Sequence, residues 1–189
     1  MELMECFENV NFIQKGSFFV VGLEADINYN YEGDLCPITG LWEAWRKGEL
    51  WQSIPDQVSD GVFYGITHSE DSENKAKCMV CVEVSSLANL PAGFVGRKFP
   101  ACEHAVFDTT LDIIWSGNFW RTFYAKWLPS SGYALPDKQL KEEYPTFTKY
   151  PDIEVYPKDW KDKYSTMQIY APVVKNNLGG LLDDDKKDT

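Results

Sequence analysis

Ile153-Glu154-Val155-Tyr156 and Met167-Gln168-Ile169-Tyr170-Ala171 decide the fold, because both alternate with the period of two that is typical of β-strands. Glu154 and Tyr156 share one face of the first strand, and Gln168 and Tyr170 share one face of the second. If the two strands are antiparallel neighbours, we predict that one sheet face carries a carboxylate, an amide and two phenols. Such a face is either a binding pocket or a solvated surface, and the pattern alone leaves both open.

Apolar and β-branched runs predict further strands, and aromatic residues at helical spacing predict two helices. The strands fall at residues 18–25, 62–67, 77–84 and 98–108, and a polar loop falls at 68–76. Leu41, Trp42 and Trp45 have the spacing of one helix. For the second helix we predict Asn118 as the N-cap and Pro129 as the end.

Both halves of the chain thus run in the order strand, helix, strand, strand. We predict an α+β fold with duplicated βαββ halves, at about residues 12–90 and 95–174, that form a concave antiparallel sheet with two long helices and a central ligand groove. An α+β domain without internal symmetry is the alternative. We expect one domain over residues 1–178 and an acidic disordered tail at 179–189.

The composition excludes several classes of protein. With 29 Asp and Glu against 18 Lys and Arg, the net charge of −11 argues against nucleic-acid binding. The N-terminus lacks the features of a signal peptide and no apolar run is long enough to span a membrane, so we expect a cytoplasmic protein. Phe, Tyr and Trp number 11, 10 and 7, a surplus that supplies rings for both a core and a binding pocket.

The sequence lacks the motifs of common hydrolases, nucleotide-binding proteins and metalloproteases. Cys78 and Cys81 have the spacing of half a zinc site, but no second pair follows, so we predict buried free thiols and neither metal nor cofactor. We expect His68 to be a surface residue in the loop and His104 to be a satisfied histidine within a strand.

Six stretches occur in the order and spacing of the GyrI-like small-molecule-binding family, which includes the effector-binding domains of AraC-type and MerR-type multidrug regulators. They are Val62-Phe63-Tyr64-Gly65-Ile66, Leu90-Pro91-Ala92-Gly93, Phe99-Pro100-Ala101-Cys102-Glu103-His104-Ala105-Val106-Phe107, Trp127-Leu128-Pro129-Ser130-Ser131-Gly132-Tyr133, Ile153-Glu154-Val155-Tyr156 and Met167-Gln168-Ile169-Tyr170-Ala171-Pro172-Val173. The chain resembles stand-alone members of this family over about residues 12–174.

The resemblance implies a groove between the two halves and assigns residues to it. In the family an acidic residue on the penultimate strand meets cationic or amphipathic aromatic ligands, and Glu154 matches that position. Gln168 stands where many members carry a second acid, which weakens the expected selectivity for cations. Aromatic walls are implied at Tyr64, Tyr156 and Tyr170, with flanking helical rings at Trp42, Trp120 and Phe123.

Three functions follow from these observations. The first is binding of a hydrophobic or cationic aromatic small molecule, with Glu154 or else Glu83 as the anchor, for sequestration or sensing of toxic compounds. The second, implied by hydrolase members of the family, is hydrolysis of strained, cyclopropane-containing compounds, with Glu154 as general acid or base and Tyr156 assisting. The third is an acidic modulator that docks on a basic protein partner.

Overall fold

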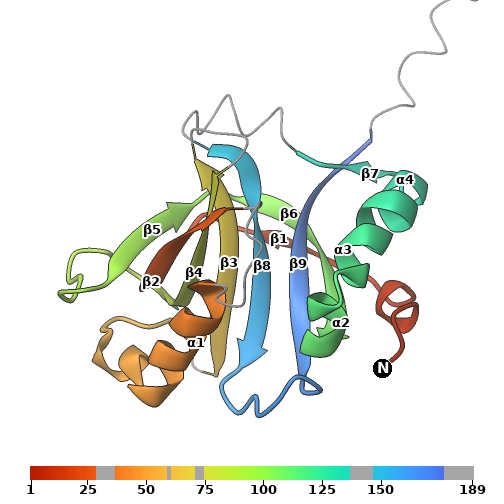
Figure 1. Cartoon of the computed structure of the whole chain (residues 1–189). Coiled ribbons are helices and arrows are strands. Elements are labelled where there is room, and N and C mark those ends of the chain that lie inside the picture. Colours follow the sequence, from red (N-terminus) through yellow and green to blue (C-terminus); the bar gives the residue numbers. More distant parts are fainter. Residues whose placement is uncertain (29–36, 59–60, 71–74, 137–146, 177–189) are drawn as a thin grey trace, which may run out of the picture.

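The structure is a computed structural model, and it describes residues 1–28, 37–58, 61–70, 75–136 and 147–176 (Figure 1). The tail expected at 179–189, together with Cys36, lies outside these residues. The strands are β1 (Asn11–Lys15), β2 (Phe18–Asn28), β3 (Val62–Glu70), β4 (Lys75–Val84), β5 (Val95–Phe99), β6 (Cys102–Thr110), β7 (Tyr133–Ala134), β8 (Phe147–Pro157) and β9 (Thr166–Lys175). The main helix is α1 (Pro37–Lys47), and a second helical region comprises α2 (Leu111–Trp115), α3 (Asn118–Thr122), the π-helix η3 (Phe123–Trp127) and α4 (Leu128–Ser130).

Within the described residues, the strands form a nine-stranded antiparallel sheet in the order β1-β6-β9-β8-β3-β4-β2-β5, with β7 paired to β9. The order is symmetric about the β8–β3 pair, because β4 and β2 follow β3 as β9 and β6 follow β8. One strand of each half also pairs with a strand of the other half. In this way β1 of the first half pairs with β6, and β5 of the second half pairs with β2. The predicted α+β fold with an antiparallel sheet is therefore confirmed.

Both helical regions cover the same face of the sheet (Figure 1). Trp45 of α1 and Phe119 of α3 are completely buried in one cluster with Phe107 and Ile169 of the sheet. The opposite face of the sheet carries a second apolar cluster around Tyr64, Ile153 and Val155. The sheet thus separates two apolar layers, and only the first contains helical residues within the described parts of the chain.

The prediction of a second long helix, with Asn118 as its N-cap and Pro129 as its end, is wrong in detail. Gly117, in the left-handed conformation, occupies the N-cap, so Asn118 is the first helical residue rather than the cap. Pro129 lies inside the last turn, α4, and the π-helix η3 directly precedes that turn. Proline has no backbone N–H, so it cannot donate the hydrogen bond that an α-helical residue makes to the carbonyl four positions earlier. A local π-turn is one way in which a helix accommodates a proline. The rings follow helical spacing, but the helix is not uniform.

Two further predictions along the chain are also wrong. His68 is buried within β3 rather than exposed in a loop, because β3 continues through Glu70 and β4 already begins at Lys75. The apolar run at 98–108 is divided between β5 and β6, since Pro100 cannot donate to the sheet ladder. His104 lies in a strand as predicted, although its Nε2 has no hydrogen-bond partner among the described residues.

No described helix has the length and apolar character needed to cross a membrane.

Gly22 should be essential to the packing of β2 between β4 and β5. A Cβ there would lie 2.0 Å from the carbonyl oxygen of Val80 and 2.6 Å from the Cα of Cys81. We expect Gly22→Ala to lower the free energy of unfolding by about 2 kcal/mol or more, because backbone atoms cannot move aside. Chemical denaturation measures this difference. Gly16→Ala, where nothing lies within 4 Å, is the control and should change stability by less than about 0.5 kcal/mol. Equal losses in both variants would contradict the prediction.

Candidate functional site

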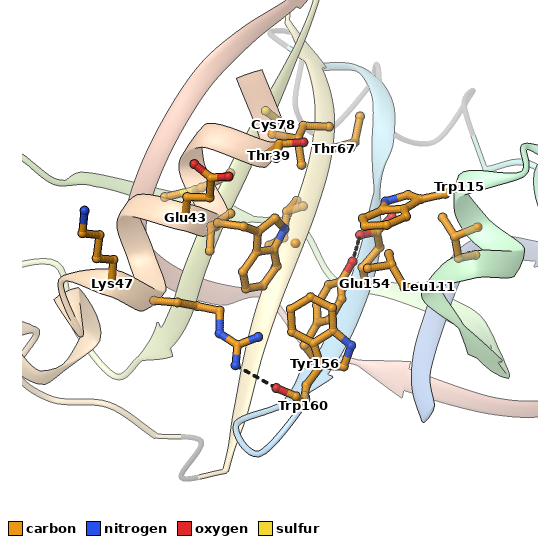
Figure 2. Close-up of a pocket in the computed structure, with 18 residues that line it drawn as sticks. Thr39, Glu43, Lys47, Thr67, Cys78, Leu111, Trp115, Glu154, Tyr156 and Trp160 are labelled. Carbon is orange, nitrogen blue, oxygen red and sulfur yellow. Dashed lines mark hydrogen bonds between the residues drawn. The ribbon is translucent and has the colours of Figure 1, made fainter. Parts of the chain in front are cut away.

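A cavity of about 880 Å³ lies on the helix-covered face of the sheet, a volume typical of small-molecule sites (Figure 2). Its base is formed by β3, β4 and β8, one side by α1, and the opposite side by α2. Trp160, in the segment after β8, completes the wall. The two helical sides come from the two halves of the chain, so the cavity lies where the halves meet.

Glu154 is held at the base of the cavity by its pairing with β3. Its cross-strand partner is Gly65, and a Cβ at that position would lie 3.1 Å from Oε2 of Glu154 and 3.3 Å from the ring of Tyr156. A side chain at position 65 would therefore crowd both residues. Glycine leaves the space that the carboxyl and the phenol occupy.

The protonation of Glu154 is strongly affected by its surroundings. Burial raises the pKa of the Glu154 carboxyl to about 7, and repulsion from Asp152 adds to the rise. The Tyr156 hydroxyl opposes this shift by donating a hydrogen bond to Oε2, at 2.5 Å. Near neutral pH the carboxyl therefore exists in both protonation states. Such a group can bind a cation, donate a hydrogen bond or transfer a proton.

Aromatic rings from three segments form one wall of the cavity. The ring centroid of Trp42 lies 4.5 Å from that of Tyr156, and the Trp160 centroid lies 5.3 Å from that of Tyr156. On the side of α2, Trp115 is 68% exposed although it lines the cavity. Figure 2 shows it on the α2 side of the cavity, across from α1. A flat apolar ligand could therefore contact rings on both sides of the cavity.

The rim on α1 carries charged side chains. Glu43, Arg46 and Lys47 line the cavity from this helix. The Arg46 guanidinium lies over the Trp160 ring, 4.8 Å from its centroid, and donates a hydrogen bond of 2.9 Å to the Trp160 carbonyl oxygen. Arg46 thus connects α1 to the segment that follows β8.

The structure brings three of the eight predicted ligand-binding residues to the cavity: Glu154, Tyr156 and Trp42. The prediction that Gln168 and Tyr170 share a face with Glu154 is wrong. Val155 pairs with Gln168, and Ile153 pairs with Tyr170, so those two side chains lie on the opposite sheet face. There Gln168 donates a hydrogen bond to Asp108 and accepts one from Tyr170.

The remaining predicted residues also lie away from the cavity. Tyr64 is on the opposite face, where its hydroxyl donates to Glu83, and Glu83 forms a 2.8 Å ion pair with Lys15. Phe123 is completely buried in the core, and Trp120 packs against that core. Of the two candidate anchors, only Glu154 lines the cavity.

Several cavity residues were missed by sequence reasoning. Trp115 and Trp160 lie outside the helices and strands predicted from the sequence. The helical spacing of Leu111, Ile114 and Trp115 is a signal that could have found Trp115. Gly65 was part of a quoted motif, yet its role depends on its partner across the sheet. Arg46 lies one position after Trp45 on the predicted helix, and only the fold shows that it reaches Trp160.

The cysteines and histidines do not gather in the described parts of the chain. Cys6, Cys78, Cys81 and Cys102 are buried free thiols. Cys78 lines the cavity, whereas the Cys81 thiol donates to the Tyr64 carbonyl oxygen on the other side of the sheet. No group of three or more metal-binding side chains occurs among the described residues.

A family model described as Cass2, integron-associated effector binding protein, matches residues 12–173. The chain belongs to this family. Cass2 is a GyrI-like family, so the resemblance inferred from the six motifs is confirmed. The family and the cavity together indicate that this Cass2 family member binds a small molecule. No curated protein matches the chain significantly.

Solved structures with the same fold cover nearly all of the chain at low sequence identity. A Vibrio cholerae integron cassette protein from the mobile metagenome is 17% identical, with a TM-score of 0.56 over 89% of this chain and 97% of its own. SAV2435 bound to tetraphenylphosphonium is 15% identical, with a TM-score of 0.62 over 88% and 94%. The EcmrR C-terminal domain is 13% identical, with a TM-score of 0.59 over 89% and 98%. These similarities establish the fold.

Glu154 should destabilise the folded protein at alkaline pH. The pKa of its carboxyl rises from 4.5 in the unfolded chain to about 7 in the folded protein. The stability that the protonated carboxyl contributes is therefore fully present below pH 4.5 and is lost as the pH rises through 7. We expect Glu154→Gln to be more stable than the wild type by about 3 kcal/mol at pH 8, and by less than about 1 kcal/mol near pH 5. Urea denaturation at several pH values measures the difference.

Glu43→Gln, at the exposed rim of the same cavity, is the matched control. Its difference from the wild type should vary little between pH 5 and pH 8. A gain for Glu154→Gln that is equally large at both pH values would contradict the pH-linked cost of the Glu154 charge.

Proposed function

We propose that the protein binds an aromatic or amphipathic small molecule in the cavity over β3 and β8, with Glu154 as the polar anchor, and so sequesters or senses toxic compounds. The observation that carries this proposal is the carboxyl of Glu154 at the base of a large cavity whose wall contains Trp42, Tyr156 and Trp160. Most of the affinity comes from removing apolar surface from water, at roughly 25 cal/mol per Å² before ordering costs.

The chemistry of the anchor supports a cationic group on the ligand. An ionised carboxylate attracts a cation, and the neighbouring ring faces add cation–π attraction. SAV2435, which shares the fold, has been solved with the lipophilic cation tetraphenylphosphonium. By analogy, that cation is a suitable probe for this chain.

Binding of a permanent cation should displace the proton from Glu154. Because the pKa of this carboxyl is about 7, the cation competes with the proton below that pH. We expect the affinity for tetraphenylphosphonium to fall by up to about tenfold per pH unit below pH 7 and to level off above pH 8. Isothermal titration calorimetry at pH 5.5, 6.5, 7.5 and 8.5 measures the affinity, and buffers with different ionisation enthalpies give the number of protons released.

Two matched variants test the anchor itself. Glu154→Gln should weaken binding at pH 8 by about tenfold or more and abolish the pH dependence, because the charged partner is gone. Glu83→Gln, a carboxyl on the opposite face of the sheet, should leave binding within about twofold of wild type. The anchor role is wrong if Glu154→Gln binds like the wild type at pH 8, or if the two variants weaken binding equally.

Hydrolysis of a strained, electrophilic compound is a second candidate function, favoured by one observation. The Glu154 carboxyl has a pKa of about 7 and lies within hydrogen-bond distance of a phenol, which is the arrangement a general acid or base needs near neutral pH. As a base, Glu154 removes a proton from water as the oxygen attacks a cyclopropane carbon. The ring C–C bond breaks, and its electrons are taken up by the electron-withdrawing group and then by a proton.

This activity predicts turnover of a cyclopropane that carries an electron-withdrawing group. Chromatography of the ring-opened product should show a rate that rises with pH around 7 and falls about a hundredfold or more in Glu154→Gln. Tyr156→Phe, which removes only the hydroxyl partner, should shift the pH at which the rate rises. Turnover that survives Glu154→Gln unchanged would rule out the mechanism.

A further inference from the structure

We infer that the natural ligand is an aromatic zwitterion: its aromatic body carries an anionic group, such as a carboxylate, towards Arg46 and Lys47, and a cationic group towards Glu154. The inference rests on the proposed binding function and specifies its ligand class. It comes from the charged residues that line the cavity and from how Arg46 is held.

The cavity does not share the acidic character of the chain. The chain as a whole has a net charge of −11, whereas the cavity is lined by two acids, Glu43 and Glu154, and two bases, Arg46 and Lys47. When Glu154 is protonated, the lining is net positive. A site that selected simple cations would be expected to concentrate negative charge, so this balance favours a ligand that carries both signs.

The two bases that line the cavity are not paired with acidic side chains in the described part of the chain. Among the described residues, neither Arg46 nor Lys47 forms an ion pair with a carboxylate; the ion pairs there involve Lys15, Lys77 and Arg97. A guanidinium has five N–H donors, and the bond to the Trp160 carbonyl uses a single one of them. The remaining donors suit a carboxylate, which a guanidinium can bind through two parallel hydrogen bonds.

A purely structural explanation accounts for only part of this arrangement. Lys47 and Arg46 are in the last turn of α1, where positive charge stabilises a helix end. That role needs no contact outside the helix. Arg46, however, lies over the ring of Trp160 and hydrogen-bonds to its backbone, 114 residues away in the chain. These contacts fix the guanidinium at the cavity wall, next to the aromatic surface that the proposed ligand contacts.

The anionic and cationic ends of the site are separated by its aromatic wall. Figure 2 shows Lys47 and Glu154 on opposite sides of the cavity, with Tyr156 and Trp160 on the Glu154 side. Arg46 donates its hydrogen bond to the Trp160 carbonyl oxygen. A ligand whose rings lie against this wall can place one polar group at each end. This geometry suits an aromatic zwitterion better than a compact ion.

Rhodamine B and its ethyl ester test the inference, because they share one cationic ring system and differ only in a free carboxylate. We expect wild type to bind the acid about five- to tenfold more tightly than the ester, as measured by fluorescence anisotropy at pH 8. Arg46→Gln should weaken binding of the acid about fivefold and leave the ester within twofold. Arg46→Lys, which keeps the charge but not the fork of donors, should retain part of the preference.

Arg121→Gln is the control, since Arg121 lies on α3 and is absent from the cavity lining. It should leave the affinity of both dyes unchanged. The inference is overturned if wild type binds acid and ester equally, or if Arg46→Gln weakens both alike, while tetraphenylphosphonium still binds through Glu154. If neither dye nor tetraphenylphosphonium binds to wild type, the proposed function itself fails, and the ligand class fails with it.

Discussion

The antiparallel pairing of β3 with β8 is the contact on which the site depends. On one side of this pair lie β4 and β2, and on the other lie β9 and β6, so the pair joins the two halves of the sheet. Its register sets Gly65 opposite Glu154, which puts the carboxyl on the helix-covered face and leaves room for it. Because α1 belongs to one half and α2 to the other, the same pairing brings the two sides of the cavity together.

Local periodicity was enough to place Glu154 and Tyr156 on one face of their strand. It was not enough to place Gln168 and Tyr170 relative to them. A shift of one residue in strand register moves every side chain to the other face, and the register between β8 and β9 is a non-local property. The observed pairs, Val155 with Gln168 and Ile153 with Tyr170, have the opposite parity from the one assumed. The family resemblance extended to the strands and their order, but it did not fix this register.

The aromatic residues show the same limit for helices. Trp42 and Phe123 both lie at helical spacing, yet one lines the cavity and the other is completely buried. Spacing identifies the face that turns towards the sheet, but whether that face meets a core or a cavity depends on what lies across from it. Trp115 has helical spacing with Leu111 and Ile114, but its place in the cavity, like that of Trp160, depends on the arrangement of α2 and of the segment after β8. The aromatic surplus is therefore divided between core and cavity by tertiary packing.

The electrostatics of the cavity follow from the cost of burying one carboxylate. Burial and the repulsion from Asp152 favour the protonated carboxyl of Glu154 more strongly than the hydrogen bond from Tyr156 favours the ionised one, so the proton is retained up to about pH 7. With the proton bound, the charged residues that line the cavity carry a net positive charge. Without it, the charges of Glu43 and Glu154 balance those of Arg46 and Lys47. One proton therefore sets the net charge of the lining near neutral pH, and in the proposed binding mode a ligand with groups of both signs satisfies Glu154 and Arg46 in the same bound state.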